Sequence, residues 1–236
     1  MKVGVIQSSY IPWRGYFDLI DEVDLFVFYD DVQFSKGSWR NRNRIKTARG
    51  LSWISVPVRH KTLAQLICET EIEPGVEWEK KQLGQFREAY VDAPHFKLAI
   101  AFLESALARK LRTISELNVF LVKELCAFLG IRTELVMSSQ FPVRGAKTDR
   151  LLMLLKEVGA NAYLSGPTAK GYLVESEFRD AGIALEYKSY GYAPYPQQWG
   201  DFEGAVTVLD LIANCGPDSR ALLKSVTPNE RAALPA

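Results

Sequence analysis

Apolar runs and helical spacing alternate along the first thirty residues of the chain. Residues 2–7 (KVGVIQ) form one apolar run, residues 16–20 place apolar side chains at helical spacing, and residues 24–30 (DLFVFYD) form a second run. Short apolar runs bounded by polar residues are typical of buried strands. The pattern predicts a strand, a compact helix and a second strand, which pair in parallel as a right-handed βαβ unit.

The pattern changes twice between residues 50 and 130. Residues 52–58 and 64–72 have more polar alternation, which predicts two strands joined by a hairpin turn. Three amphipathic segments follow, and the last begins after Thr113 as an N-cap and ends at Gly130. They predict a block of three helices.

The second half of the chain returns to alternating strands and helices. Strands are expected at 133–139, 161–166 and 183–190, with helices at 147–159 and 169–182 between them. A loop rich in proline and aromatic residues then precedes a helix that ends at Gly216, and the polar tail after Pro217 is expected to be peripheral. The predicted fold is a single α/β domain over residues 1–236, with a doubly wound, mainly parallel, Rossmann-like sheet and a helical insertion at about 77–130.

Composition and charge narrow the classes of partner. A chain of 236 residues that is 47% hydrophobic can bury a substantial core, and its net charge of +1 offers no general attraction to nucleic acid or membranes. No apolar stretch approaches the roughly 20 residues of a membrane span, and the first residues lack the pattern of a signal peptide. Three widely spaced cysteines and two histidines, without a CxxC motif, predict neither a disulfide framework nor a structural zinc site. We therefore expect a cytoplasmic protein that acts on a small molecule.

The segment after the first predicted strand is unusually aromatic. Tyr10, Trp13 and Tyr16 present flat faces that suit a sugar or a base, and Gly15 permits close approach. Ligands of open parallel sheets bind at the carboxyl ends of strands, where this segment falls. Packing in the core is the alternative interpretation.

The segment after the second predicted strand holds the densest cationic cluster of the chain. Asp30 and Asp31 end the strand. The cluster that follows comprises Lys36, Arg40, Arg42, Arg44 and Lys46, with Trp39, Asn41 and Asn43 between the arginines. Guanidinium groups beside carboxylates suit a phosphorylated or nucleotide-linked ligand, with a carboxylate free to act as a base or to hold Mg²⁺. A solvated loop whose charges pair with each other is the alternative.

Two further features are candidate site elements. Gly166 ends a predicted strand and Tyr172 lies near the start of the next predicted helix, an arrangement that can bind an anion through backbone amides or merely allow tight packing. His60 lies in a predicted turn and is a candidate catalytic residue. The P-loop, GxGxxG and GxSxG spacings are absent, and covalent catalysis is not favoured.

Taken together, the unusual segments resemble the WbqC-like protein family. The resemblance is carried, in order, by QSSYIPWRGYFDLI, FVFYDDVQFSKGSWRNRNRIK, WISVPV, AYLSG, GYL and YPQQWGDFEGAVTVLDLIANCG. The family's opening usually has proline where this chain has Ser8. By position, the resemblance implicates Gln7, Tyr10, Pro12, Trp13, Gly15, Tyr16, Asp30, Asp31, Gln33, Trp39, Asn41, Arg42, Asn43, Gly166, Tyr172, Tyr195, Gln197, Asp210 and Gly216.

The resemblance implies a role in surface-polysaccharide, O-antigen or other cell-envelope biosynthesis. It suggests glycine, aminoacyl or acyl transfer to an amino-sugar or similar acceptor. Such a reaction needs a base and an oxyanion donor. The candidates are Asp30, Asp31 or His60 as base, Gln7, Asn41 or Asn43 as oxyanion donor, and Arg42 and Lys36 as diphosphate ligands.

Two other functions stay open at this point. The layout of the first strands also resembles pantothenate-synthetase-like nucleotidylyl transferases, so an ATP-dependent nucleotidylyl transferase or adenylating ligase is an alternative. The two histidines of that family's loop are absent here. A non-catalytic nucleotide-sugar binding module is the third possibility. The sequence identifies no cofactor.

Overall fold

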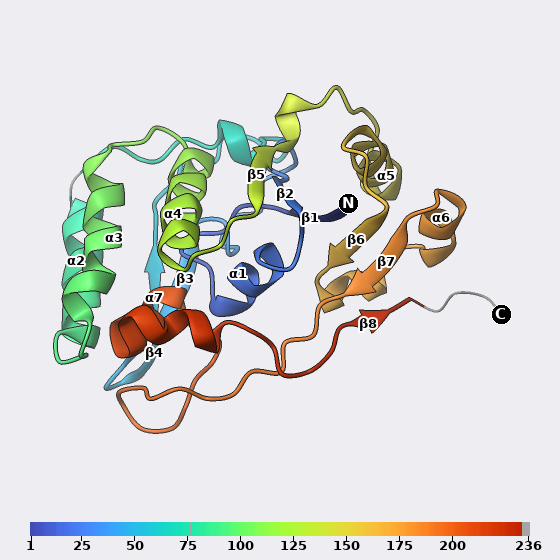
Figure 1. Ribbon diagram of the computed structural model, residues 1–236. Coiled ribbons are helices and arrows are strands. Elements are labelled where there is room, and N and C mark those ends of the chain that lie inside the picture. Colours follow the sequence, from blue (N-terminus) through green and yellow to red (C-terminus); the bar gives the residue numbers. More distant parts are fainter. Residues whose placement is uncertain (76, 233–236) are drawn as a thin grey trace.

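A six-stranded sheet forms the centre of the computed structural model, which describes residues 1–75 and 77–232 (Figure 1). The strand order is β5-β2-β1-β6-β7-β8. Their bounds are β1 (Lys2–Ile6), β2 (Leu25–Phe28), β5 (Glu134–Met137), β6 (Ala162–Ser165), β7 (Ala184–Tyr187) and β8 (Glu230–Arg231). The first five strands pair in parallel, and β8 pairs antiparallel with β7. The predicted mainly parallel, Rossmann-like α/β fold is confirmed.

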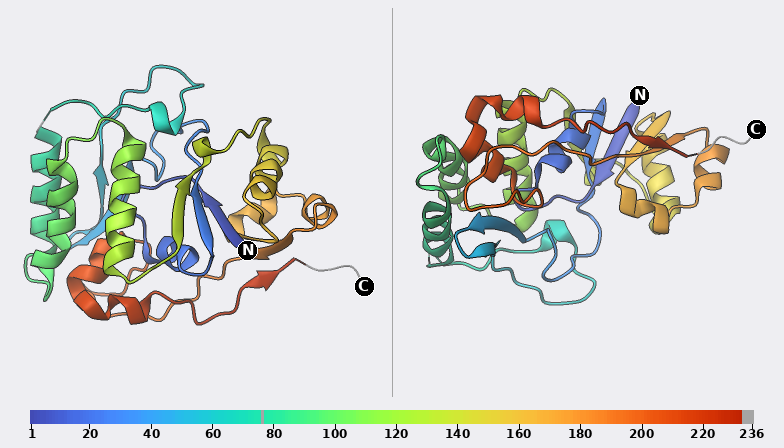
Figure 2. Two further views of the ribbon diagram at one scale, coloured as in Figure 1. Left: turned by 45° about the horizontal axis from the view of Figure 1, so that its top comes forward. Right: turned by 90° about the horizontal axis from the view of Figure 1, so that it is seen from below.

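Helices cover both faces of the sheet, because alternate strand residues point to opposite sides. Phe26 and Phe28 belong to one hydrophobic cluster, whereas Val3, Val5 and Val27 belong to another. The first cluster contains side chains of α1 (Arg14–Ile20), α2 (Glu77–Tyr90), α3 (Phe96–Ala108), α4 (Ile114–Phe128) and α7 (Val208–Cys215). The second contains side chains of α5 (Lys147–Glu157) and α6 (Glu175–Asp180), and Figure 2 shows the two groups of helices on opposite sides.

The order of the strands creates a crevice between β1 and β6. From β1 the chain adds β2 and β5 on one side, and it then returns to place β6 and β7 on the other. Lys2 pairs with Ala162 and Gly4 with Leu164, so the two strands run side by side to their carboxyl ends. In open α/β sheets the loops diverge at such a point of reversal, and ligands bind there.

The three helices predicted between residues 77 and 130 are confirmed as α2, α3 and α4. Thr113 caps α4, since its side chain accepts a hydrogen bond from the Glu116 amide at 3.2 Å and the Glu116 carboxylate accepts one from the Thr113 amide. These helices share one hydrophobic cluster with α1. That the whole chain is a single domain with this block as an insertion stays a prediction. Within the described part of the chain, no helix combines the length and apolar character needed to cross a membrane.

The predicted hairpin over residues 52–72 is wrong in its position. The antiparallel pair is β3 (Arg42–Thr47) with β4 (Gly50–Ser55), a separate two-stranded sheet. Residues 64–72 form only a short 3₁₀ turn, η1 (Ile67–Glu69), and isolated bridges. The sequence hides β3 because Asn43 and Lys46, polar residues, occupy buried positions next to Ile45.

The C-terminal half differs from its prediction in two places. The helix expected over residues 169–182 is divided into η3 (Pro167–Gly171) and α6, because a glycine ends the first turn. The tail after residue 217 is more than peripheral, since it contributes η4 (Gly216–Leu222), the fully buried Leu223 and the edge strand β8. Its last residues, 233–236, lie outside the described part of the chain.

A buried ion cluster fastens the segment after β7 to α1. Lys188 Nζ lies 2.7 Å from Asp18 Oδ2 and 2.8 Å from Glu22 Oε2, and Asp18 is completely buried. The Tyr192 hydroxyl also donates a hydrogen bond to Asp18 Oδ2, at 2.8 Å. The cluster therefore positions the segment that carries Tyr190 against the helix that follows Trp13.

Replacing Lys188 with methionine tests this fastening. We expect Lys188→Met to lower the free energy of unfolding by about 3–5 kcal/mol, because the buried Asp18 carboxyl would lose its closest cation. Urea denaturation measures the change. Lys156→Met, at an exposed position of α5, is the matched control. Equal stability of the two variants would contradict the assignment.

Candidate functional site

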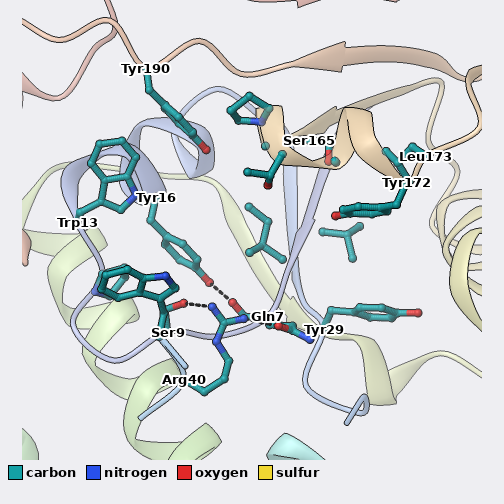
Figure 3. Close-up of a pocket in the computed structure, with 18 of the residues that line it drawn as sticks. Gln7, Ser9, Trp13, Tyr16, Tyr29, Arg40, Ser165, Tyr172, Leu173 and Tyr190 are labelled. Atoms are coloured by element: carbon teal, nitrogen blue, oxygen red, sulfur yellow. Dashed lines mark hydrogen bonds between the residues drawn. The ribbon is translucent and has the colours of Figure 1, made fainter. Parts of the chain in front are cut away.

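A cavity of about 980 Å³ opens at the crevice between the ends of β1 and β6 (Figure 3). Its floor comes from the two strands and its walls come from the loops that follow them, from residues 39–44 and from the start of α5. The polar and aromatic lining residues include Gln7, Ser9, Trp13, Tyr16, Tyr29, Trp39, Arg40, Asn43, Arg44, Lys147, Thr148, Ser165, Gly166, Thr168, Tyr172 and Tyr190.

Aromatic side chains form two sides of the cavity. Figure 3 shows Trp13 and Tyr190 on one side and Tyr172 with Tyr29 on the other. Trp13 meets Tyr190 edge to face, with ring centroids 4.9 Å apart. Tyr172 is largely exposed. Flat faces on two sides of one cavity suit a planar base or a sugar ring.

Gly15 allows Trp13 to pack closely over the first turn of α1. A Cβ atom on Gly15 would lie 2.4 Å from Cζ2 of the Trp13 indole, far inside contact distance. Gly15 is thus a positioning residue for Trp13 and does not itself line the cavity.

Arg40 places a positive charge between the aromatic sides. Its guanidinium donates one hydrogen bond to Ser9 Oγ at 2.7 Å and another to Gln7 Oε1, while its Nε has no partner. Among residues 1–75 and 77–232, no carboxylate oxygen lies within 4.0 Å of its nitrogens. Burial lowers the pKa of Arg40, and the charges of Tyr16 and Asp30 oppose that effect. The sequence counted Arg40 only as one member of the cationic cluster, and the family resemblance implicated Arg42 instead.

The cavity as a whole is cationic. Arg44 and Lys147 join Arg40 in its lining, and among the described lining residues none carries a carboxylate. Lys147 and Thr148 open α5, whose N-terminus has no side-chain cap, so free backbone amides add to the positive potential. No group of three or more His, Cys, Asp or Glu residues in the described chain is placed to hold a metal ion. The arrangement suits an anionic, flat ligand.

Asn43 holds the loop that follows β1. Its Nδ2 donates to the carbonyl oxygens of Tyr10 and Ile11 at 3.0 and 2.7 Å, and its Oδ1 accepts from the Arg44 amide at 2.8 Å. Ile11 has a φ of 40°, a conformation that β-branched residues rarely adopt. Asn43 therefore supports a strained loop as well as lining the cavity.

The two candidate catalytic aspartates do not line either of the two large cavities. Asp30 is completely buried and accepts hydrogen bonds from the Ser8 amide at 2.7 Å and from the Ser115 hydroxyl. Asp31 pairs with Arg150 and accepts a hydrogen bond from Ser138. Both carboxylates thus have hydrogen-bond donors from distant segments, and neither reaches the cavity.

His60 lies apart from the main cavity, in a second cavity of about 750 Å³. Lys36 and Asn41 also line this second cavity. Arg42 instead lies over the Trp53 ring, 4.2 Å from its centroid. Gln33 forms an isolated bridge with Leu66, and the buried Tyr10 hydroxyl donates to Gln82.

Tyr195 and Gln197 belong to a buried polar network around Asp210. Asp210 accepts hydrogen bonds from Tyr90 at 2.8 Å and from Tyr195 and Gln197 at 2.7 Å each. Burial raises the pKa of Asp210, and these hydrogen bonds oppose that effect. Gln197 Oε1 accepts from Lys46 Nζ at 3.0 Å, which connects the network to β3. These residues support the strand that carries Asn43.

The sequence-predicted residues thus divide by position. The structure brings together around the main cavity Gln7, Trp13, Tyr16, Trp39, Asn43, Gly166 and Tyr172. It places elsewhere Tyr10, Gly15, Asp30, Asp31, Gln33, Lys36, Asn41, Arg42, His60, Tyr195 and Gln197. The structure adds Ser9, Tyr29, Arg40, Lys147 and Tyr190.

Comparison with known proteins identifies the family. The model of the WbqC-like protein family matches residues 7–222, beginning at the first residue after β1. The chain belongs to the WbqC-like protein family. This WbqC-like protein is 43% identical over 226 residues to the uncharacterized protein Rv1507c of Mycobacterium tuberculosis. The aligned region covers 94% of this chain and 97% of that relative. No solved structure matches it. The resemblance expected from its motifs is confirmed.

The close contact at Gly15 gives a testable prediction for this WbqC-like protein. We expect Gly15→Ala to displace the Trp13 indole from Tyr190, because the added methyl group would overlap the ring. Near-ultraviolet circular dichroism, which reports the asymmetric surroundings of aromatic rings, would then weaken. Gly84→Ala in α2, where a Cβ meets no atom within 4 Å, is the control and should leave the spectrum intact. An unchanged spectrum for Gly15→Ala would show that the indole is free to adjust.

The support that Asn43 gives to the loop is a second test. We expect Asn43→Asp to lower the free energy of unfolding by about 2–4 kcal/mol, because a buried carboxylate would replace two donors and face two carbonyl oxygens. Chemical denaturation measures the loss. Asn161→Asp makes the same change at an exposed residue whose Oδ1 accepts from the terminal amine, and should cost little. A loss at Asn43 no greater than that at Asn161 would refute the role.

Proposed function

We propose that this WbqC-like protein is a transferase that binds a nucleotide-linked or phosphorylated sugar in the cavity between β1 and β6. The observation that carries the proposal is Arg40, a cation without a carboxylate partner among the described residues, set between aromatic side chains. Arginine has five N–H donors in a planar fork that matches phosphate geometry. Two of its hydrogen bonds go to Gln7 and Ser9, which fix the fork and leave donors for a ligand.

The rest of the lining supports the same class of ligand. The uncapped start of α5 offers backbone amides for a phosphate, and Lys147 and Arg44 add charge. Trp13 and Tyr172 offer flat surfaces for a base or a sugar ring. An anion at this point would meet attraction from every charged side chain in the described lining.

The finer form of the proposal is acyl or aminoacyl transfer to an amino-sugar or similar acceptor in cell-envelope polysaccharide biosynthesis. In this form the Arg40 guanidinium, which Gln7 and Ser9 hold in place, binds a phosphate of the donor. Gln7 lies in the lining as an amide able to donate to a developing oxyanion, whereas both N–H groups of Asn43 Nδ2 are already bound to the carbonyl oxygens of Tyr10 and Ile11. Family membership supports a shared activity and does not name the donor or the acceptor.

Calorimetry with a panel of ligands tests the proposed function. The panel comprises UDP, UDP-N-acetylglucosamine, ADP, and ATP with and without Mg²⁺. We expect a nucleotide-sugar to bind and Arg40→Met to weaken it about 10- to 100-fold, because a charge-assisted hydrogen bond to phosphate is lost. Arg132→Met, at an exposed residue, should bind as the unmodified chain does.

The other outcomes of this panel are equally informative. Tight binding of ATP only with Mg²⁺ would favour the nucleotidylyl transferase or adenylating ligase. Equal affinity of a nucleotide-sugar for Arg40→Met and Arg132→Met would show that Arg40 does not bind it. Binding without turnover of any acyl or aminoacyl donor would leave a binding module in place of a transferase.

A further inference from the structure

The second cavity, of about 750 Å³, lies beside the main one and has a different chemistry. It lies against β4, the segment that follows β4 and the start of α2. The side chains used in this argument are Lys36, Asn41, Trp53, His60, Trp78 and Lys81.

A pair of tryptophans separates the two cavities. Trp39 lines the main cavity and Trp53 lines the second, and their ring centroids lie 5.4 Å apart. The segment between Lys36 and Arg44 also serves both cavities, since Arg40 faces the main one and Asn41 faces the second. Ligands bound in the two cavities would therefore lie on opposite sides of one thin wall.

Three side chains that line the second cavity each have one buried polar atom without a partner within the described protein. These atoms are Trp78 Nε1, Asn41 Oδ1 and His60 Nε2. Asn41 already donates from Nδ2 to the Val56 carbonyl at 3.0 Å, so its oxygen is the free acceptor. Native structures pair almost all buried polar groups, so an unpaired donor and an unpaired acceptor on side chains that line one cavity favour a ligand with hydroxyl groups.

The charged residues of this cavity are mostly cationic. Arg59 is neutralised by Glu73, 3.0 Å away, which is the one acidic residue in the described lining. Lys36 and Lys81 form no ion pair with described residues. Trp53 adds an apolar ring surface next to them. A hydroxylated ring that carries one negative charge matches this set of groups.

We propose that the second cavity is a separate binding site for a sugar ring that carries a carboxylate or a phosphate. Trp78 donates to a ring hydroxyl, Asn41 accepts from another, and Lys36 and Lys81 hold the acidic group. This site goes beyond the proposed function, because the wall of Trp39 and Trp53 keeps its ligand apart from a group that reacts in the main cavity.

Calorimetry with glucuronate, glucose 6-phosphate and glucose, each added to the full chain, tests this site. We expect at least one acidic sugar to bind about tenfold or more tightly than glucose, since the lysines add a charge-assisted contact. The two acidic sugars distinguish a carboxylate from a phosphate. Trp78→Phe, which keeps a ring and removes the N–H, should weaken the acidic sugar about tenfold. Lys81→Met, at an exposed residue, should do the same without a risk to folding.

Two matched variants locate the binding. Trp199→Phe removes an indole N–H that donates to the Ala89 carbonyl at 2.8 Å, away from both cavities, and should leave acidic-sugar binding unchanged. Arg40→Met should also leave it unchanged while weakening the nucleotide-sugar. If acidic-sugar binding is lost in Arg40→Met and kept in Trp78→Phe, the sugar binds in the main cavity and the proposed site in the second cavity is overturned. The proposal is also overturned if neither acidic sugar binds more tightly than glucose. If no nucleotide or nucleotide-sugar binds, but an acidic sugar binds and Trp78→Phe weakens it, the proposed function is overturned and the second site stands.

Discussion

The carboxamide of Asn43 is the constraint on which the site depends. Ile11 stands at positive φ, a conformation that costs about 1–3 kcal/mol in a non-glycine residue and persists only where the surroundings enforce it. Asn43 enforces it with two hydrogen bonds to consecutive carbonyl oxygens, and Asp30 holds the amide of Ser8 three residues earlier. The loop between these two anchors carries Ser9 and leads directly to Trp13. The main cavity therefore exists only once β3 has docked against the loop after β1.

Buried carboxylates outside the main cavity support this arrangement, whereas the charged side chains in its described lining are all cations. Asp210 binds Tyr195 and Gln197, Gln197 binds Lys46, and Lys46 lies in β3, three residues beyond Asn43. Asp18 fastens the segment that carries Tyr190. Each acid is satisfied by hydrogen bonds or an ion pair, which offsets the cost of burying it. Several positions that the family resemblance implicates therefore lie outside the main cavity and support residues that line it.

The sequence is informative where apolar pattern decides the structure and silent where pairing between distant residues decides it. Periodicity predicts buried strands such as β2 and the helices α2 to α4. The rule that ligands bind at the carboxyl ends of strands predicts that Trp13 and Tyr16 line the cavity. The burial of Asp30 depends on Ser115, 85 residues away, and no local pattern reports it. Neighbouring arginines are equally indistinct in sequence, because the folded position of the segment decides that Arg40 enters the main cavity and Arg42 lies on Trp53. The apolar pattern also missed β3, because the buried positions of this strand include the polar residues Asn43 and Lys46.

The wall between the two cavities has a consequence for electrostatics. Arg42 lies 4.2 Å over the Trp53 ring, Arg44 lies 5.6 Å from the centre of the Trp39 ring, and neither forms an ion pair with the described residues. A guanidinium held on an indole keeps its charge and is weakly hydrated, so its field extends to both sides of a thin wall. Two anionic ligands on opposite sides of an uncharged wall would repel each other. Cations within the wall offset that repulsion, and they do so most effectively when both cavities are filled. A wall of tryptophan and arginine is thus physically suited to hold two acidic molecules next to each other.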